Sequence, residues 1–415
     1  MGSDLENARD TSAPRPKRRI LKRVLKTLAV LVVVLGAVGG YLYATQRTHH
    51  SAATKAPAPV AASNDPMLDA IRRGCEYLKV HQEGDHEFSA GLLDPKPAVT
   101  ALVVDAIANS PDGSRYESDE FVRQACTAIL SHQQEDGGIY TPGIGLANYC
   151  TSISIMALSS VDAARFSKEI ERATAYIRTC QLGVESGDQA GGFGYGGSGG
   201  NADLSNTVQS LEALRQAGVS PDDPAMKRAV EFINRCQNRT ESNPAPWAMN
   251  DGGFIYRPGV TRAKEVKKPD GTVGYESYGL MSYAGLLSFL HANVAKDDPR
   301  VVSAVAWIRG HYTFEENVNL GDHGRYYCYV VMSKALSAYG ERRLKDDRGE
   351  EHDWPVELAE CAEGLQRADG SWCNEKSDRW MEGDSVLVTA YMVRALSTCW
   401  RVVHGPGAAP PPASK

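Results

Sequence analysis

A two-part unit recurs through the body of the chain and limits its fold more than any other feature. The first half runs from a small residue, through an aromatic–aliphatic pair, to a glutamine eight positions on, and a glycine-rich turn follows. Its apolar positions fall on one face of a helix. Clear copies are GCEYLKVHQ (74–82), ACTAILSHQ (125–133), ATAYIRTCQ (173–181) and AVEFINRCQ (229–237). The segments 304–312 and 358–366 are weaker copies.

The second half of the unit is a helix that is apolar almost all round. A hydroxyl residue stands six positions before an Ala-Leu pair in TSISIMAL (151–158), TVQSLEAL (207–214), YVVMSKAL (329–336) and TAYMVRAL (389–396). Related segments are 100–107 and 278–287, and an insertion, 257–274, precedes the latter. Six such units predict twelve helices in two layers, which form either an open solenoid or a closed ring. The near-constant unit length and the apolar second helices favour closure. We therefore expect an all-α fold, an α6/α6 toroid, over residues 66–403.

The N-terminal part of the chain predicts a membrane anchor. Residues 1–26 are strongly basic, and the uncharged stretch 27–45 is close to the ~20 residues that span a bilayer. The positive-inside rule places the N-terminus in the cytoplasm and the toroid on the extracytoplasmic side. A cleaved signal peptide is the alternative. Residues 46–65 are predicted to be a disordered linker, and residues 404–415 a disordered tail.

Charge and cysteine content exclude several classes of function. The net charge is −6, and residues 1–26 carry eight basic against three acidic residues, so the remaining chain carries −11. An acidic body argues against nucleic acid as a partner. The nine cysteines lie mostly within apolar helical patterns, which predicts free, buried thiols. No Cys/His spacing is typical of a zinc site, so we predict neither a metal nor a cofactor.

One turn carries a family resemblance. The segment QRADGSW (366–372) resembles the QW repeat of squalene-hopene and oxidosqualene cyclases. The helix pairs are similar to those of the β subunits of protein prenyltransferases. This resemblance to the terpenoid cyclase/protein prenyltransferase superfamily covers residues 66–403 and implies the α/α toroid. It implies no single activity, because such folds host several. It also implies that a ligand lies between the inner-helix N-termini and the adjoining loops.

The catalytic motif of the cyclases is incomplete in this chain. Their Asp-x-Asp-Asp-Thr motif begins an inner helix, and DLSNT (203–207) stands in the same register. Ser205 and Asn206 replace the second and third aspartates. Protonating an alkene needs a strong acid held neutral, which Ser205 is not. We therefore expect Asp203, Ser205 and Asn206 to cap the helix.

The prenyltransferase zinc set is also incomplete. That family binds zinc through an Asp and a Cys two residues apart, with a distant His on the last inner helix. Here Tyr326 stands two residues before Cys328, and the segment 386–396 contains no His. Without these ligands no metal would activate a thiolate, so we expect Cys328 to belong to the core.

The remaining candidate residues lie near predicted inner-helix starts. Asp322 and His323, beside Arg325 and Tyr326, suit an acid/base or anion-binding cluster, although a capped helix start with a solvated His is the favoured interpretation. The candidates for catalysis are Asp203, Asp322, His323 and Asp384. Any two of the aspartates could serve a glycoside hydrolase, but the sequence selects no pair. The candidates for ligand binding, with core packing as the alternative, are Tyr149, Asn206, Tyr275, Tyr278, Arg325, Tyr326, Trp372 and Trp380.

Two functions follow from these observations. The first is a membrane-anchored, non-catalytic toroid that binds an apolar or isoprenoid ligand, a peptide or a protein partner. The second is a divergent terpenoid-cyclase/prenyltransferase-like enzyme that acts on a lipid through Asp203 and the pair Asp322 and His323. The first is favoured because both catalytic sets are incomplete. Convergence of these side chains in one enclosed apolar cavity would favour the enzyme, and dispersal around a wet rim would favour the binding module.

Overall fold

The computed structural model describes residues 62–90, 94–113, 119–196 and 200–405, together with residues 57, 60 and 408. The chain divides into two units, Met1–Lys55 and Ala56–Lys415, and every described residue lies in the second. Four predicted segments lie wholly or mostly outside the described residues, namely the basic tail 1–26, the transmembrane helix 27–45, the linker 46–65 and the tail 404–415.

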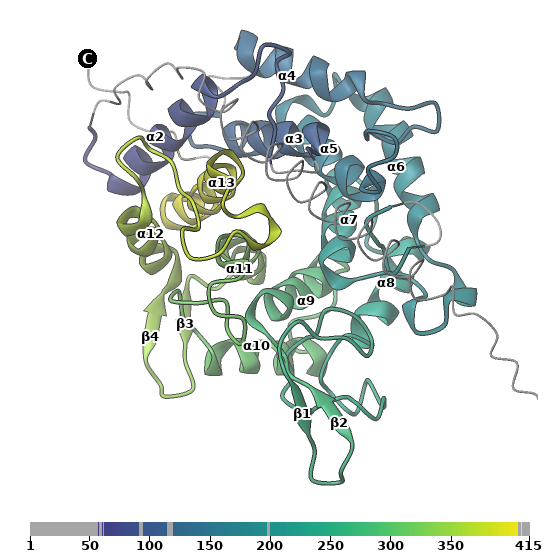
Figure 1. Cartoon of the computed structure of the whole chain (residues 1–415). Coiled ribbons are helices and arrows are strands. Elements are labelled where there is room, and N and C mark those ends of the chain that lie inside the picture. Colours follow the sequence, from purple (N-terminus) through teal and green to yellow (C-terminus); the bar gives the residue numbers. More distant parts are fainter. Residues whose placement is uncertain are drawn as a thin grey trace, which may run out of the picture. The chain divides into compact units, whose positions relative to one another are not determined.

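Helices form two concentric layers in this unit (Figure 1). The inner layer consists of α3 (Lys96–Ala108), α5 (Ala147–Asp162), α7 (Leu204–Gln216), α9 (Gly279–His291), α11 (Arg325–Tyr339) and α13 (Ser385–His404). Each inner helix contacts the next, and α13 contacts α3, so the described inner helices close into a ring. The predicted closure of the helical repeat is therefore confirmed.

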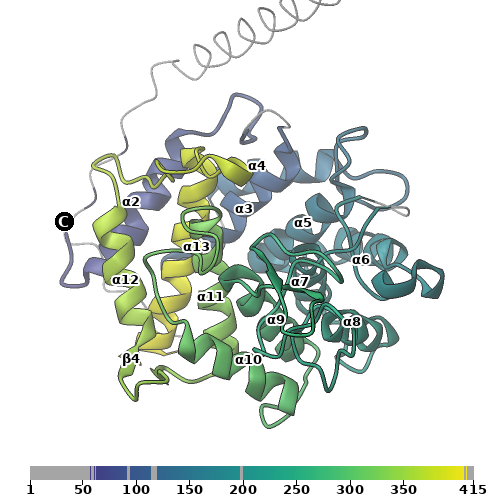
Figure 2. The same cartoon turned by 60° about the horizontal axis from the view of Figure 1, so that its bottom comes forward.

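The outer layer consists of α2 (Pro66–Val80), α4 (Glu120–Ser131), α6 (Ser167–Cys180), α8 (Pro224–Asn234), α10 (Pro299–Gly310) and α12 (Trp354–Leu365). Their burial follows the sequence pattern, because α4 buries only Val122, Ala125, Cys126 and Ile129, which lie on one face. Inner α9, in contrast, buries every residue from Gly279 to Phe289. Figure 2 shows the outer helices packed around the ring.

The inner helices run parallel, which gives the ring two different ends. The C-terminal ends of α3 and α5 are joined by a hydrogen bond of 2.8 Å from Asn109 Nδ2 to Ser160 Oγ. Arg401, near the end of α13, also donates to Asn109. We call the end at which the inner helices begin the mouth.

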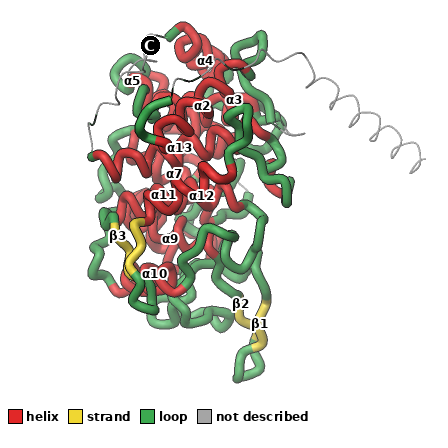
Figure 3. Tube along the Cα trace, turned by 90° about the vertical axis from the view of Figure 1, so that its left-hand side faces the viewer, coloured by secondary structure: helices red, strands yellow, loops and turns green. Residues whose placement is uncertain are grey.

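Two short hairpins interrupt the helical pattern. The insertion forms β1 (Glu265–Lys267) and β2 (Val273–Tyr275), which pair antiparallel just before α9. The second hairpin, β3 (Arg343–Lys345) and β4 (Glu351–Asp353), follows the C-terminal end of α11. Figure 3 shows the hairpins on opposite sides of the helical ring. Short 3-10 segments occur at Val184–Gln189 and Arg379–Met381.

The cysteines and the apolar helix α13 belong to the core. All nine cysteines are free, and seven of them, including Cys328, are buried, as the sequence predicts. Among the described residues, α13 alone is long and apolar enough to cross a membrane, but 72% of its apolar stretch is buried within the ring. Its apolar character therefore reflects packing between α2, α3, α11 and α12.

The repeated glutamine joins neighbouring units at four junctions, whereas Gln82 in the first unit binds, among the described residues, only the carbonyl of His86 in its own turn. Gln366 Nε2 donates to the carbonyl of Gly370 in its own turn and to that of Ala70 in α2, both at 2.9 Å. This second bond closes the ring across 296 residues of sequence. The same pair of bonds is made by Gln133 to Gly137 and Glu169, by Gln181 to Gly191 and Ala225, and by Gln237 to Gly252 and Arg300. We call this arrangement the glutamine clasp.

Arginines complete three of these clasps. Arg73 Nε donates to Gln366 Oε1 at 3.0 Å, and Arg172 and Arg228 do the same for Gln133 and Gln181. Each arginine lies three residues after the carbonyl that its glutamine binds. At the fourth clasp Ser303 takes the arginine's place, and Gln237 Oε1 has no hydrogen-bond partner among the described residues.

The repeated hydroxyl binds the turn of its own unit. The N–H of Trp372 donates to Thr389 Oγ1 at 3.0 Å. The N–H groups of Phe88, Ile139, Phe193 and Phe254 bind Thr100, Thr151, Thr207 and Ser282 in the same way. Outer helix, turn and inner helix are thereby held as one piece. In the fifth unit, Arg325 Nε and the hydroxyl of Tyr329 instead donate to the carbonyl of Phe314.

The clasp predicts a strong dependence on the turn glycine. Gly370 has φ +87°, and an added Cβ would lie 2.7 Å from the carbonyl oxygen of Arg73. Gly143 has the same φ but open space around it. We expect Gly143→Ala to cost about 1 kcal/mol from backbone strain alone. Gly370→Ala should cost at least ~1 kcal/mol more, because the clasp must shift. Denaturant titrations of the full chain measure the free energy of unfolding of both variants. An equal decrease for Gly370→Ala and Gly143→Ala would contradict this role for the turn.

Candidate functional site

The start of α7 is a capped helix. The carboxylate of Asp203 accepts from the backbone N–H of Asn206 and from Asn206 Nδ2, both at 2.8 Å. Thr207 Oγ1 donates to the carbonyl of Asp203 at 2.7 Å and accepts from the N–H of Phe193. Asp203 is therefore the N-cap that the sequence predicts.

Ser205 does not share in this cap. Its hydroxyl lies 3.3 Å from the hydroxyl of Tyr327 on α11, across the ring. Gln209 Nε2, one turn further along α7, donates to the same tyrosine oxygen at 2.7 Å. The position that would hold the second aspartate of the cyclase motif thus belongs to a polar contact between two inner helices. The expectation that Ser205 caps α7 is wrong, because its side chain faces the interior of the ring.

Burial sets the acidity of Asp203. Its side chain is 2% exposed, and this burial raises its pKa from 3.8 to about 6, although the two bonds from Asn206 oppose the rise. A carboxyl with this pKa is a weaker acid than an ordinary aspartate. Because both oxygens accept bonds from Asn206, the site is built around the carboxylate form and not around a proton donor to an alkene.

Three tyrosines fill the interior of the ring behind Ser205. Tyr149 on α5, Tyr327 on α11 and Tyr391 on α13 line the same small cavity, and the rings of Tyr327 and Tyr391 are 5.5 Å apart. Burial raises the pKa of all three hydroxyls. The cavity that remains has a volume of about 20 Å³, which is room for about one water molecule.

A layer of buried charges lies deeper in the ring. Lys334 Nζ on α11 is 2.9 Å from Glu212 Oε1 on α7, and Arg394 Nε on α13 is 2.9 Å from Asp105 Oδ2 on α3. Burial alone would raise the pKa of both carboxyls. The facing cations outweigh it and hold the pKa of Asp105 and of Glu212 below its ordinary value.

This charged layer was not predicted from the sequence, although the repeat carries a signal for it. Each of its four residues stands five positions after the hydroxyl that binds the turn. That position is occupied by Asp105, Met156, Glu212, Leu287, Lys334 and Arg394 in the six units. Two acids and two bases at one register position of otherwise apolar helices indicate pairing within the ring.

The candidate catalytic residues lie in separate places. Asp203 contributes to an open cleft of about 410 Å³, the mouth cleft, lined by Tyr195, Tyr256, Arg257, Arg262 and neighbouring glycines. Asp322 lines a different cleft of about 480 Å³.

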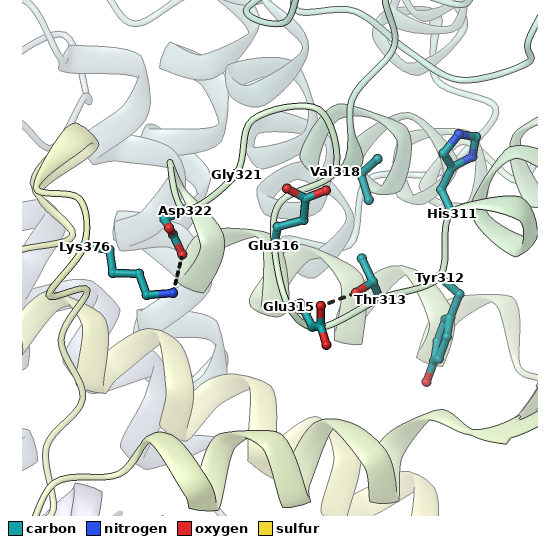
Figure 4. Close-up of a pocket in the computed structure, with 9 residues that line it drawn as sticks. All are labelled: His311, Tyr312, Thr313, Glu315, Glu316, Val318, Gly321, Asp322 and Lys376. Atoms are coloured by element: carbon teal, nitrogen blue, oxygen red, sulfur yellow. Dashed lines mark hydrogen bonds and ion pairs between the residues drawn. The ribbon is translucent and has the colours of Figure 1, made fainter.

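In that second cleft, Asp322 and Lys376 point toward each other with 3.5 Å between their charged atoms (Figure 4). His323 is exposed, and its Nδ1 lies 2.7 Å from Ser377 Oγ. Asp384 caps α13 through the N–H of Leu387. Asp322 and His323 thus stay together, whereas Asp203 and Asp384 each belong to another helix start.

The candidate ligand-binding residues are also dispersed. Tyr149 lines the interior cavity, and Arg325 is bound to the carbonyl of Phe314. Tyr275 is half-buried against Trp247, and Trp380 is exposed beside Arg379 at the mouth. Four others are buried in the core, namely Asn206, Tyr278, Tyr326 and Trp372.

A buried acid near the mouth also has a structural role. Glu382 accepts from the N–H of Tyr327 at 2.8 Å and from Asn374 Nδ2 at 2.7 Å. It therefore caps α11, although it belongs to the loop that precedes α13 in the sixth unit. Burial raises its pKa to about 7. Its carboxylate satisfies orphan N–H groups that Gly324, the residue before α11, cannot bind with a side chain.

Comparison with known proteins identifies the fold. Residues 122–240 match the family of the squalene-hopene cyclase N-terminal domain. A variant of the type II terpene cyclase MstE from Scytonema, in complex with the product merosterolic acid A, is 13% identical with a TM-score of 0.51. The match covers 81% of this chain and 98% of that one.

Two further structures of MstE agree with this match. A variant in complex with the substrate geranylgeranyl dihydroxybenzoate is 13% identical, with a TM-score of 0.50 and coverage of 81% and 98%. The apo enzyme is 15% identical, with a TM-score of 0.50 and coverage of 81% and 99%. No curated protein matches the chain. The resemblance to squalene-hopene cyclases is confirmed, and the fold is a terpene-cyclase-like α/α barrel.

The cap at Asp203 predicts a defined pH dependence. Between about pH 4 and 6 the folded chain holds a proton on Asp203 that the unfolded chain has released. The contribution of Asp203 to the free energy of unfolding therefore falls as pH rises through this window. Asp203→Asn should remove that fall and keep the cap, because Asn206 Oδ1 lacks a partner among the described residues and can accept from the new amide.

Denaturant titrations of the full chain at pH 4 and pH 7 test this expectation. The free energy of unfolding of Asp203→Asn, measured relative to that of the unmodified chain, should be higher at pH 7 than at pH 4. Asp203→Ala should lose about 1 kcal/mol of capping energy at pH 4. Burial also raises the pKa of Glu382, but Glu382 is present in every variant. Its contribution to the free energy of unfolding therefore cancels when the variants are compared at one pH. A pH-independent difference for Asp203→Asn would contradict the assignment.

Proposed function

We propose that this chain is a non-catalytic toroid that binds a protein partner at its mouth. The observation that carries the proposal is the filled interior of the ring. Ligand pockets for small molecules measure roughly 300–1,000 Å³. The interior cavity of about 20 Å³ is far below that range, so an isoprenoid has no room among the inner helices.

The charged layer favours a permanently filled interior. Opening the lumen would separate Lys334 from Glu212 or Arg394 from Asp105. Breaking a buried ion pair by removing one partner costs about 3–5 kcal/mol. A ligand would have to offset that cost and also displace Tyr327 and Tyr391. The interior therefore serves as the core of the fold, and the proposed binding site lies on the surface of the ring.

The mouth cleft supports an acidic peptide as the bound group. Arg257 and Arg262 line it, and no carboxylate lies within ion-pair distance of either among the described residues. The Arg262 guanidinium is 4.3 Å from the centre of the Tyr256 ring, which holds it at the cleft. The carboxylate of Asp203, the acid of the cleft, already accepts two hydrogen bonds from Asn206. Unpaired guanidinium groups bind carboxylates in a bidentate manner.

The N-terminal sequence supports a location for this module. The predicted span 27–45 would anchor the chain with its N-terminus in the cytoplasm and the toroid at the extracytoplasmic face. The alternative function is a divergent cyclase-like enzyme that acts on a lipid. Its support is Asp203, a buried carboxyl of raised pKa that opens onto the mouth cleft.

Incubation with isoprenoids separates the two functions. The full chain, mixed with squalene or with geranylgeranyl dihydroxybenzoate, should form no cyclised product detectable by mass spectrometry. It should also show no saturable binding of either compound. Tyr327→Ala should enlarge the interior and destabilise the chain by up to about 3–5 kcal/mol, because the partly buried ring packs against the core. Turnover that Asp203→Ala abolishes would overturn the non-catalytic assignment.

Binding of a fluorescein-labelled oligoglutamate peptide tests the mouth cleft. The full chain should bind the peptide in a salt-sensitive manner. Arg262→Glu should raise the dissociation constant at least ~tenfold, which is about 1.4 kcal/mol. Lys267→Glu, the same charge reversal on exposed β1 outside the cleft, is the matched control and should change it far less. Equal losses in the two variants would show a non-specific charge effect and contradict the proposed cleft.

A further inference from the structure

Three metal-binding side chains meet on the hairpin opposite the mouth. Asp346, Glu350 and His352 each offer one ligand atom, and these atoms lie within 4.8 Å of one another. Asp346 and Glu350 belong to the turn of the hairpin, and His352 belongs to β4, which lies beside α12 (Figure 1). The hairpin follows α11 and is absent from the repeat pattern.

The turn holds Asp346 in a fixed position. Its side chain is 2% exposed, and its Oδ1 accepts from the N–H groups of Arg348 and Glu350 at 3.0 and 2.8 Å. Its Oδ2 lies 3.7 Å from His352 Nε2, which is too long for a hydrogen bond. Two ligand atoms on one tetrahedral zinc ion lie roughly 3.3 Å apart, so this pair needs only a small shift to share an ion.

The imidazole of His352 is oriented as a metal ligand. Its Nδ1 lies 3.1 Å from Glu357 Oε2, which also accepts from the hydroxyl of Tyr312 at 3.0 Å. The Tyr312 ring packs against the imidazole with 4.4 Å between their centres. An Nδ1 proton donated to Glu357 leaves the Nε2 lone pair directed at Asp346. A carboxylate behind the imidazole is the usual support of a ligating histidine.

The unpartnered Nε2 atom of His352 is the observation that indicates a bound ion. His352 Nε2 is a buried atom with no hydrogen-bond partner among the described residues, and the side chain is only 12% exposed. A lone pair facing a carboxylate oxygen is repulsive unless a proton or a metal ion lies between them, and the 3.7 Å separation is longer than an N–H···O bond. Arg348 Nε binds the same Asp346 oxygen at 2.8 Å, but this side chain is 74% exposed and can withdraw into solvent.

We propose that Asp346, Glu350 and His352 form a binding site for a divalent transition-metal ion such as zinc. One imidazole and two carboxylates suit zinc or cobalt, whereas calcium and magnesium prefer oxygen ligands alone. The ion replaces the guanidinium of Arg348 on Asp346 and leaves further coordination positions to water. We assign the ion a structural role, because its ligands come from one hairpin and none of them lines the mouth cleft or the cleft at Asp322.

The position of the site explains what the ion stabilises. The fifth unit ends in Tyr312 where other units carry the clasp glutamine. Its hydroxyl reaches Glu357, in the first turn of the next outer helix, where a glutamine would bind a backbone carbonyl. The chain Tyr312–Glu357–His352–ion–Asp346 therefore joins α10, α12 and the hairpin at a junction that has no glutamine clasp.

Metal titration of the chelator-treated full chain tests the proposal. Calorimetry with zinc should give this site in both the unmodified chain and the linker variant His49→Gln/His50→Gln, and cobalt should give a visible d–d absorption band from an imidazole/carboxylate environment. His352→Ala should weaken binding at least ~tenfold. Arg348→Ala, which removes the competing cation without touching a ligand, should tighten it. Zinc bound by the unmodified chain should also raise its unfolding temperature, and this gain should vanish in His352→Ala.

Adjacent histidines in the predicted linker provide the control. His49 and His50 are a competing metal-binding pair, so the double variant His49→Gln/His50→Gln should keep the site and its cobalt spectrum. No uptake of zinc or cobalt would overturn the proposal. So would uptake unchanged in His352→Ala, or uptake lost in the linker variant. None of these results bears on the mouth cleft.

Discussion

The glutamine clasp is the interaction on which the rest of this ring depends. A helix pair buries its inner helix only against its neighbours, so an isolated unit leaves an apolar face and its turn carbonyls exposed. Each clasp satisfies a carbonyl in its own turn and one in the next outer helix. Gln366 makes the same bonds to the first helix of the chain, so the last unit meets the first with no exposed end.

Closure determines what the interior becomes. Because the inner helices run parallel and in register, side chains five positions after the turn hydroxyl converge on the ring axis. Asp105, Glu212, Lys334 and Arg394 occupy that layer; Lys334 pairs with Glu212 between α11 and α7, and Arg394 pairs with Asp105 on the neighbouring helix α3. Buried pairs of this kind contribute less to stability than to specificity, since a wrong register would leave four charges unpaired. Tyr149, Tyr327 and Tyr391 close the space above them.

A shared fold therefore does not carry a shared chemistry here. The likeness to the MstE structures, at 13–15% identity, concerns the arrangement of helices. The interior of this ring contains buried salt bridges, and Arg257 and Arg262, which have no ion-pair partner among the described residues, line the mouth cleft. Two departures from the repeat coincide with the proposed sites. Arg257 and Arg262 come from the insertion in the fourth unit, and the metal-binding set joins the fifth unit, which has Tyr312 in place of the glutamine.

The sequence by itself determined the two helical layers and the cap at Asp203, because periodicity and capping are local properties of the chain, and it favoured a closed ring over an open solenoid. It predicted the wrong role for Ser205 and left the burial of Tyr278 and Trp372 open, since a residue near a helix start can face either core or solvent. Only the tertiary structure decided which side chains fill the interior. The partners in each ion pair are more than a hundred residues apart, and nothing local indicates which charges meet. Ring closure brings them together.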